Sequence, residues 1–199
     1  MSRLKVYTGE DVYSQAKSRI SYVFDNFERI YLSFSAGKDS TVMMHLVTEE
    51  AIKRNRKIGI LFIDLEAQYA ETINTAIKMF DTYKDNIELY WICLPISLRN
   101  AVSNYDPKWT CWDPHQKDLW VRTFPKHNGV ITDPTFFPFF QPGFEFEEFV
   151  PEFAKWYSLG KPTACFVGIR ADESLNRFRT IASKTKIKYN DKTWTPNFK

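Results

Sequence analysis

Residues 30–40 read IYLSFSAGKDS, an apolar run followed by a turn of small residues and a lysine. The run is typical of a buried strand, and Met43, Leu46 and Val47 then recur at helical spacing. Backbone N–H groups converge in a turn between a strand and a helix, and the helix dipole adds partial positive charge. The stretch therefore predicts an anion-binding turn, named here the phosphate turn (residues 35–40).

The same alternation of strand and helix extends on both sides of this unit. Apolar runs at 58–63, 87–92 and 163–169 predict further strands, separated by segments with helical periodicity. Continuous apolar strands that alternate with amphipathic helices are typical of a parallel sheet buried on both faces. We therefore expect an α/β fold, a Rossmann-like parallel sheet with helices on both faces.

Three more helices are expected along the chain. The first begins at Thr8, which acts as the cap with Asp11 three residues later, and the second includes residues 73–80. The third covers residues 145–158, although Pro151 lies inside it. Together with the helix after the phosphate turn, these segments supply the two layers that a parallel sheet needs.

The alternation breaks in an insertion, about residues 94–160, that is rich in Pro, Trp and Phe. A loop of this length is usually functional or contains short helices that periodicity misses. Its Phe-rich part, 136–149, is expected to form local core, with a lid or a partner surface as the alternative. The basic tail at 184–199 is expected to form a hairpin. We expect one nucleotide-binding domain over residues 1–199, interrupted by this insertion.

Composition excludes several classes of protein. The chain has 199 residues, and Lys+Arg 27 against Asp+Glu 24 gives a net charge of +3, which does not indicate nucleic acid. None of the three cysteines lies in a Cys-x-x-Cys pair, so neither a zinc ribbon nor an iron–sulfur cluster is expected. No apolar run reaches the about 18 residues of a spanning helix. We expect a cytoplasmic protein with no membrane partner.

The cysteines are not expected to act as nucleophiles. Cys93 and Cys165 are interpreted as buried small residues. Cys111 lies four residues before His115, but this spacing in a loop gives no reason for an activated thiol. His45, on the helix after the phosphate turn, is interpreted as a histidine with a local partner rather than a ligand.

The phosphate turn does not match the common nucleotide motifs. The P-loop motif is Gly-x4-Gly-Lys-Ser/Thr, with two glycines separated by four residues. Here only one glycine, Gly37, precedes Lys38. No Gly-x-Gly-x-x-Gly dinucleotide fingerprint is present. The alternative is an ordinary strand-to-helix turn with a Ser or Asp cap. The position after the first strand, near the expected switch point of the sheet, favours phosphate binding.

The turn sequence SAGKDS resembles the SGGxDS pyrophosphate loop of the adenine-nucleotide alpha-hydrolase (PP-loop) superfamily. Within it, the chain is similar to the phosphoadenosine phosphosulfate (PAPS) reductase/sulfotransferase family. Two further segments agree in order. Residues 62–69, FIDLEAQY, resemble a strand that ends in Asp64 before a loop over the nucleotide. Residues 168–174, GIRADES, followed by Arg177, resemble the Gly-x-Arg-x-x-Glu-Ser…Arg segment. The resemblance covers about residues 30–180.

The most similar branch is the immunoglobulin-binding regulator A type, which WDP at 112–114 and WVR at 120–122 also fit. Two features depart from the family pattern. Ala36 replaces the first glycine of the loop, which strains the turn if this residue needs a positive φ. PAPS reductases use a cysteine on a C-terminal tail, whereas the last cysteine here, Cys165, lies in a predicted strand. Thiol-dependent PAPS reduction is therefore disfavoured. Members of the branch also continue past Lys199.

The resemblance implies that the chain binds ATP or PAPS with Mg²⁺, and that it acts at the α-phosphate or the adenylyl-sulfate end. Lys38 and Asp39 are the candidate catalytic residues, and Asp39 is also a candidate Mg²⁺ ligand. The alternative is a catalytically inert nucleotide-binding regulator that works with a partner protein. The predicted nucleotide-binding residues are Ser33, Ser35, Ala36, Gly37, Lys38, Asp39, Ser40, Asp64, Gly168, Arg170, Glu173 and Arg177.

Simpler interpretations exist for the residues outside the turn. Asp64 alone is consistent with a carboxylate that caps the loop after its strand, and Glu66 beside it is expected only to solvate that loop. Arg170, Glu173 and Arg177 are also consistent with a salt-bridged first turn of a helix. The turn and the arginine segment must meet at one edge of the sheet for the nucleotide interpretation to hold.

Overall fold

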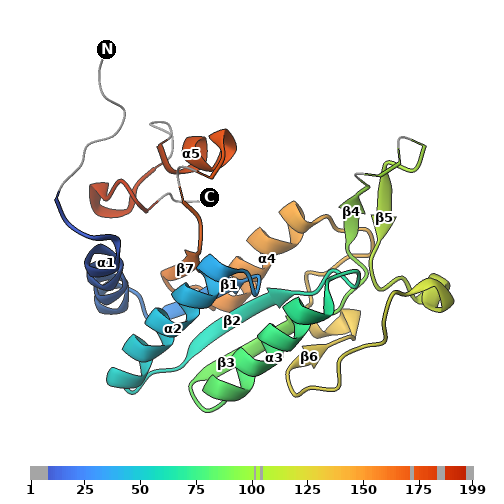
Figure 1. Cartoon of the computed structure of the whole chain (residues 1–199), viewed down its shortest axis with the longest axis horizontal. Helices are drawn as coiled ribbons and strands as arrows, with labels where there is room; N and C mark the ends of the chain where they lie inside the picture. The colour runs from blue at the N-terminus through green and yellow to red at the C-terminus, as the bar shows by residue number, and fades with distance from the viewer. Residues whose placement is uncertain (1–8, 101, 104, 171–172, 183–186, 196–199) are drawn as a thin grey trace.

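The computed structural model describes residues 9–100, 102–103, 105–170, 173–182 and 187–195. Its central sheet has five parallel strands in the order β6-β3-β2-β1-β7 (Figure 1). The expected parallel sheet is confirmed, and its first, second and third strands lie where the apolar runs predicted them. The strands are β1 (Arg29–Phe34), β2 (Ile58–Ile63), β3 (Ile87–Ile92), β6 (Val130–Ile131) and β7 (Thr163–Val167).

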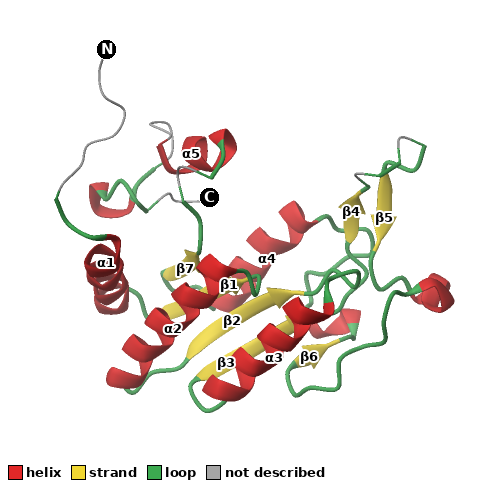
Figure 2. Cartoon of the chain, in the orientation of Figure 1, coloured by secondary structure: helices red, strands yellow, loops and turns green. Residues whose placement is uncertain are grey.

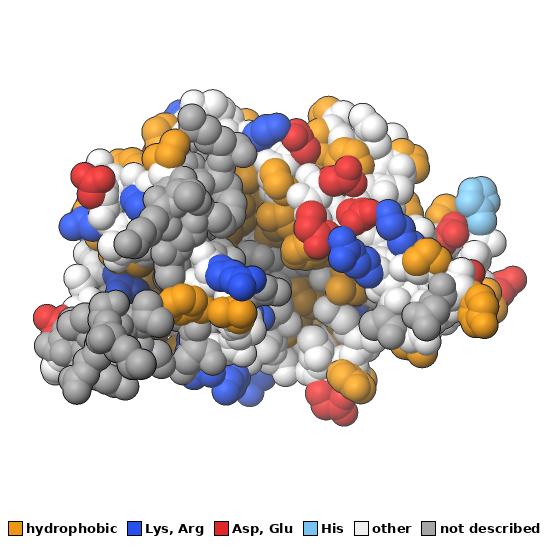
Figure 3. Space-filling view, turned by 90° about the horizontal axis from the view of Figure 1, so that it is seen from above, with side chains coloured by type: hydrophobic (Ala, Val, Ile, Leu, Met, Phe, Trp, Pro, Cys, Tyr) orange, Lys and Arg blue, Asp and Glu red, His pale blue; other side chains and the backbone are white. Residues whose placement is uncertain are grey.

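Helices cover both faces of this sheet, as predicted. Helices α2 and α3 lie on the face toward the viewer, and α4 lies on the opposite face (Figure 2). Seen from above, the molecule is hollowed in its middle, between the side that carries α1 and α5 and the side that carries β4 and β5 (Figure 3). The helices are α1 (Val12–Asn26), α2 (Lys38–Lys53), α3 (Ala70–Tyr83), α4 (Phe146–Ser158) and α5 (Leu175–Ala182).

The strands contribute side chains to two hydrophobic layers. Phe34 of β1 packs against Phe80 of α3, with ring centroids 5.6 Å apart. Tyr31 of the same strand packs against Phe153 of α4 on the other face, at 5.4 Å. All residues of β2 are buried. Burial on both faces explains why the strands read as unbroken apolar runs rather than as an alternating pattern.

Helix α4 approaches the sheet closely at Gly59. The Tyr157 hydroxyl of α4 donates a hydrogen bond of 2.9 Å to the Ile30 carbonyl oxygen. A Cβ on Gly59 would lie 2.8 Å from the Tyr157 ring. The Arg29 guanidinium covers the same ring, 4.1 Å from its centroid. A glycine is therefore required at the second residue of β2, where an apolar side chain would otherwise be expected.

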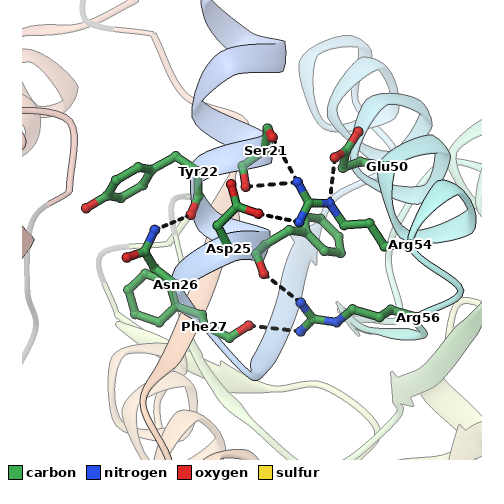
Figure 4. Close-up of polar contacts among 9 residues, drawn as sticks. Ser21, Tyr22, Asp25, Asn26, Phe27, Glu50, Arg54 and Arg56 are labelled. Carbon is green, nitrogen blue, oxygen red and sulfur yellow. Dashed lines mark hydrogen bonds and ion pairs between the residues drawn. The ribbon is translucent and has the colours of Figure 1, made fainter.

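Two arginines after α2 fasten α1 to the rest of the fold (Figure 4). Arg54 donates to Glu50 of its own helix at 2.7 Å and to the Ser21 hydroxyl of α1 at 2.9 Å, and it also pairs with Asp25. Arg56 binds the C-terminal end of α1, where carbonyl groups lack helical partners. It donates to the carbonyl oxygens of Phe24, Phe27 and Glu28 at 2.8, 2.9 and 2.7 Å.

Several boundaries differ from the expectation. Helix α1 begins after Asp11, whose carboxylate accepts from the Ser14 N–H at 2.9 Å, so Asp11 and not Thr8 is the cap. Thr8 itself lies outside the described residues. The last strand ends at Val167, two residues earlier than predicted. The predicted helix containing Pro151 is confirmed as α4.

The insertion contains short elements that periodicity could not reveal. Strands β4 (Ser97–Arg99) and β5 (Lys108–Thr110) form an antiparallel pair, and β6 adds a fifth strand beside β3. Short 3₁₀ helices occupy Pro114–Leu119 and Pro134–Phe136. Phe137 and Phe149 are buried in the main core, whereas Phe136 and Phe146 are 48% and 40% exposed, so the expected core is confirmed for part of the Phe-rich stretch.

The basic tail contains a 3₁₀ turn, Tyr189–Asp191, where a hairpin was expected. The chain still reverses there, since the Tyr189 N–H lies 3.4 Å from the Thr195 carbonyl oxygen. Residues 184–186 and 196–199 of the predicted hairpin lie outside the described residues. Among the described residues, no helix is both long and apolar enough to cross a membrane.

The contact at Gly59 gives a prediction about stability. We expect Gly59→Ala to lower the free energy of unfolding by about 1–3 kcal/mol, because the added methyl overpacks against the Tyr157 ring. Chemical denaturation measures this change, and a double-mutant cycle with Tyr157→Ala isolates the contact. An equal loss from Gly59→Ala in the presence and absence of the Tyr157 ring would contradict it.

Candidate functional site

The phosphate turn and the segment after β7 lie at the switch point of the sheet. Strand β1 pairs with β2 on one side and with β7 on the other. All these strands are parallel, so their carboxyl ends meet at one edge. Ligands of open α/β sheets bind at such an edge, where the strand order reverses. The position expected for the turn from the sequence is confirmed by this topology.

Hydrogen bonds between serines hold the turn closed. The Ser40 hydroxyl donates to the Gly37 carbonyl oxygen at 3.0 Å and lies 3.1 Å from the Ser35 hydroxyl. Ser40 is only 4% exposed. Gly37 is the N-cap of α2 and offers no side chain to that end of the helix. Because the first-turn N–H groups of a helix have no helical carbonyl partner, they are available to an anion here.

Ala36 has the left-handed backbone conformation that a glycine adopts without cost. Its φ is +57°, whereas Gly37 has an extended φ of −76°. The Cβ of an L-residue crowds the backbone in the left-handed region, which costs about 1–2 kcal/mol. The substitution identified from the sequence therefore falls on the residue of the turn where strain arises. The surrounding hydrogen bonds hold the residue in this conformation.

Gly168 lets the end of β7 approach the first turn of α2. A Cβ at this position would lie 2.9 Å from the Ser40 nitrogen and 3.0 Å from the Asp39 carbonyl carbon. Neither backbone atom can move without shifting the helix. A glycine at 168 thus places the segment that follows β7 directly beside the phosphate turn.

A charged cluster follows this contact. The Arg170 guanidinium lies 3.9 Å from the Asp39 carboxylate of the turn. Glu173 accepts a hydrogen bond of 2.9 Å from the Arg170 backbone N–H and pairs with the Arg177 guanidinium. The Arg170 N–H and then Arg177 lower the pKa of the Glu173 carboxyl. The structure therefore brings the two predicted halves of the site together.

Asp64 belongs to a separate buried network at the end of β2. It is 1% exposed, and its oxygens accept from the Glu66 N–H at 2.9 Å and from the Trp91 indole at 2.8 Å. It also pairs with the Arg122 guanidinium. Protein donors thus bind both carboxylate oxygens. The arrangement is that of a carboxylate capping its loop, and a contact between Asp64 and the nucleotide stays a prediction.

Glu66 anchors the insertion, which corrects the expectation that it only solvates a loop. It is 4% exposed, and its oxygens accept from the backbone N–H groups of Trp112 at 2.7 Å and Val121 at 3.0 Å. The Trp112 indole in turn donates to the Asp64 carbonyl oxygen at 2.7 Å. The insertion is therefore fixed to the loop after β2 on both sides of its 3₁₀ helix, Pro114–Leu119.

The sequence did not identify Trp91 and Arg122 as partners of Asp64. A carboxylate directly after a buried strand signals that a partner is needed, but 27 lysines and arginines compete for that role in the sequence. Ser33 lies within β1 between Leu61 and Val167, and its predicted contact with a ligand stays untested. Lys38 is exposed at the start of α2.

The cysteine and histidine side chains are mostly as expected. Cys93 and Cys111 are buried, and burial raises the pKa of the Cys111 thiol to about 12, which leaves no thiolate near neutral pH. Cys165 is exposed, so the expectation that it is buried was wrong. The His45 Nδ1 lies 2.6 Å from the Tyr83 hydroxyl, which gives it the local partner that was expected.

The described residues include no group of three or more His, Cys, Asp and Glu side chains arranged for a metal ion. Magnesium is usually held by one or two carboxylates together with substrate phosphates and water. Asp39, at the start of α2, offers one carboxylate at the phosphate turn, and its role as a Mg²⁺ ligand stays a prediction. A dedicated cage of protein ligands is not required for it.

Comparison with known proteins places these features in a family. The family model of the phosphoadenosine phosphosulfate reductase domain matches residues 29–195. The chain belongs to this family. The uncharacterized protein YbdN of Escherichia coli (strain K12) is 46% identical over 197 residues, covering 98% of this chain and 48% of YbdN. The chain thus spans about half the length of that relative.

The conformation of Ala36 gives a second prediction. Ala36→Gly is expected to raise the free energy of unfolding by about 0.5–1 kcal/mol, because relief of the left-handed strain exceeds the entropy that glycine adds to the unfolded chain. Ala154→Gly, in the interior of α4, is the matched control and should lower it by a similar amount. If both variants were destabilised equally, Ala36 would not be strained.

The Glu173 pair gives a third prediction. NMR titration of the Glu173 carboxyl should give a pKa below the ordinary glutamate range, and Arg177→Gln should move it upward. Since the folded-state pKa is lowered, the stability that this group adds is present at neutral pH and is lost as the pH falls through the folded value. A normal pKa that Arg177→Gln leaves unchanged would show that the pair does not form in solution.

Proposed function

We propose that the chain binds an adenine nucleotide, ATP or PAPS, with the anionic end on the phosphate turn. One observation carries this proposal: the Arg170 guanidinium lies 3.9 Å from Asp39, within the turn. The anion-binding turn and the arginine segment, far apart in the sequence, therefore form one cationic edge. Membership of the PAPS reductase domain family supports a nucleotide as the source of the anion.

The chemistry of the two halves suits different parts of one ligand. Backbone N–H groups at the start of α2, the helix dipole and the Lys38 ammonium favour a compact anion such as a pyrophosphate. Guanidinium groups bind planar pairs of phosphate or sulfate oxygens in a bidentate manner. Arg170 and Arg177 would thus hold the second anionic group, and Glu173 positions Arg177 for that role.

Asp39 would hold Mg²⁺ together with the phosphates of ATP. The ion would neutralise phosphate charge during transfer at the α-phosphorus. The chain itself would act by position and charge: Lys38 and the turn would hold the leaving pyrophosphate, while the arginines fix the other end. No thiol takes part in this scheme.

The alternative is a nucleotide-binding regulator that does not turn its ligand over and works with a partner protein. Ala36 favours this candidate, because it departs from the glycine of the family's loop at a position whose backbone is left-handed. Binding and turnover are therefore measured separately.

Ligand-induced thermal stabilisation tests the binding. We expect ATP, PAPS or adenosine 3′,5′-bisphosphate to raise the melting temperature, since a ligand that binds only the folded state stabilises it. Lys38→Ala should weaken binding about tenfold or more, the loss of one charge-assisted contact. Lys53→Ala, at the other end of α2, removes the same charge and should leave the affinity unchanged. Absence of stabilisation by all three compounds would contradict the proposal.

Incubation with Mg²⁺ and ATP labelled at the α- and γ-phosphates then distinguishes the two candidates. Release of AMP and pyrophosphate supports an enzyme acting at the α-phosphorus. Bound nucleotide that stays intact supports the regulator.

A further inference from the structure

A cavity of about 320 Å³ lies between the loop after β2 and the insertion. Ala67 lines it from the loop, and Trp109, Asp113 and Trp120 line it from the insertion. Strand β2 is the immediate neighbour of β1, so the cavity opens at the same sheet edge as the phosphate turn. None of its lining residues belongs to the turn or to the arginine cluster.

The walls of this cavity are fixed before any ligand arrives. The Trp120 indole donates to the Asp113 carbonyl oxygen at 2.9 Å, and its ring lies 5.1 Å from the Trp112 ring. Glu66, whose carboxylate accepts from the Trp112 and Val121 N–H groups, also lines the cavity. Because both hydrogen bonds of this buried carboxylate go to the backbone, they fix the position of the insertion against the loop. The cavity is therefore preorganised.

Two aliphatic residues that line the cavity are exposed. Leu119 and Val121 are 76% and 68% exposed. Two aliphatic side chains beside two indoles form an apolar surface that a ligand would remove from water. Figure 3 shows hydrophobic and charged side chains side by side on the half of the surface that carries the insertion.

The polar lining selects the charge of the ligand. Asn100 and Gln116 contribute amide groups, and the charged lining residues are Glu66 and Asp113. Among the described residues, the lining contains neither Lys nor Arg. The cation Lys117 lies outside the lining, 5.9 Å from the Trp120 ring centroid. An anion would therefore meet acidic groups, whereas a cation would meet a carboxylate and the π faces of indoles.

We propose that this cavity binds a small, flat organic group that is uncharged or cationic, as a second ligand beside the nucleotide. A flat group would gain contact area with the indoles of Trp109 and Trp120. The side-chain amides of Asn100 and Gln116 would orient its polar edge through hydrogen bonds. The described lining residues carry acidic and amide groups, whereas the phosphate turn offers backbone N–H groups and the Lys38 ammonium to an anion. The proposal rests on the lining alone and stands whether or not the nucleotide proposal holds.

Three probes of the same size and different charge test it: benzamidine, benzamide and benzoate. Each is titrated into the whole chain while the indole N–H signals of Trp109 and Trp120 are followed by NMR. Benzamidine and benzamide are expected to shift these signals, and benzoate should bind at least about tenfold more weakly than benzamidine, the result of one unfavourable charge contact. Equal binding of all three probes would overturn the proposal.

Variants assign the binding to the cavity. Trp109→Ala should abolish the response, and Trp194→Ala, which removes an indole packed on Tyr22 of α1, should leave it unchanged. Because Trp109→Ala alters a strand, a second variant adds a gain of function: Gln116→Lys, at an exposed position, should reverse the order so that benzoate binds more tightly than benzamidine.

Competition with ATP separates this proposal from the nucleotide site. Benzamidine should bind equally in the presence and absence of ATP. Displacement by ATP would show that the cavity holds the base of the nucleotide, which would overturn the assignment of a second ligand. An unchanged preference in Gln116→Lys would show that the lining does not select charge, which would overturn the proposed ligand class.

Discussion

The contact between Gly168 and the first turn of α2 is the constraint on which the site depends. The end of β7 lies so close to the helix that a Cβ at 168 would come within 2.9 Å of the Ser40 nitrogen. This approach puts Arg170 beside Asp39 and lets Glu173 hold Arg177 at the same edge. Without this contact, the phosphate turn would be an isolated helix N-terminus. The arginines would then only form salt bridges in the first turn of another helix. The parallel order around β1 makes the approach possible, because both segments leave the sheet at the same side.

A second constraint acts at the end of β2. Buried carboxylates are costly unless they are paired and hydrogen-bonded. Asp64 satisfies this condition through Arg122 and Trp91, and Glu66 does so through two backbone N–H groups of the insertion. The long aromatic-rich insertion is therefore tied to the loop after β2, at the carboxyl edge of the sheet, by Trp112 and Val121. The contacts of Asp64 fix the loop after β2. The cavity lined by Glu66 forms where Glu66 binds the insertion to this loop.

Sequence reasoning predicted the parts of the fold that have a strong period. Strands β1 to β3 and helix α4 were found because buried strands and amphipathic helices repeat over several residues. Strand β6, with two residues, is too short to show a period, and its place beside β3 is set by tertiary pairing. The N-cap of α1 is Asp11 and not Thr8. Both residue types suit an N-cap, so the local sequence could not decide between them. The partner of Asp64 is separated from it by 58 residues, beyond the reach of any local pattern. In contrast, Ala36 was recognised as unusual from its residue type, and its positive φ supplies the physical reason.

The central claim is that one anion-binding edge is formed by residues from both ends of the chain. Titration of the isotopically labelled chain with adenosine 3′,5′-bisphosphate, followed through backbone amide signals, tests it most directly. We expect the amides of Gly37, Lys38 and Asp39 to shift together with that of Arg170, along one binding curve. Shifts confined to the turn, or absent from it while other surfaces respond, would show that the turn and the Arg170 segment do not form one site.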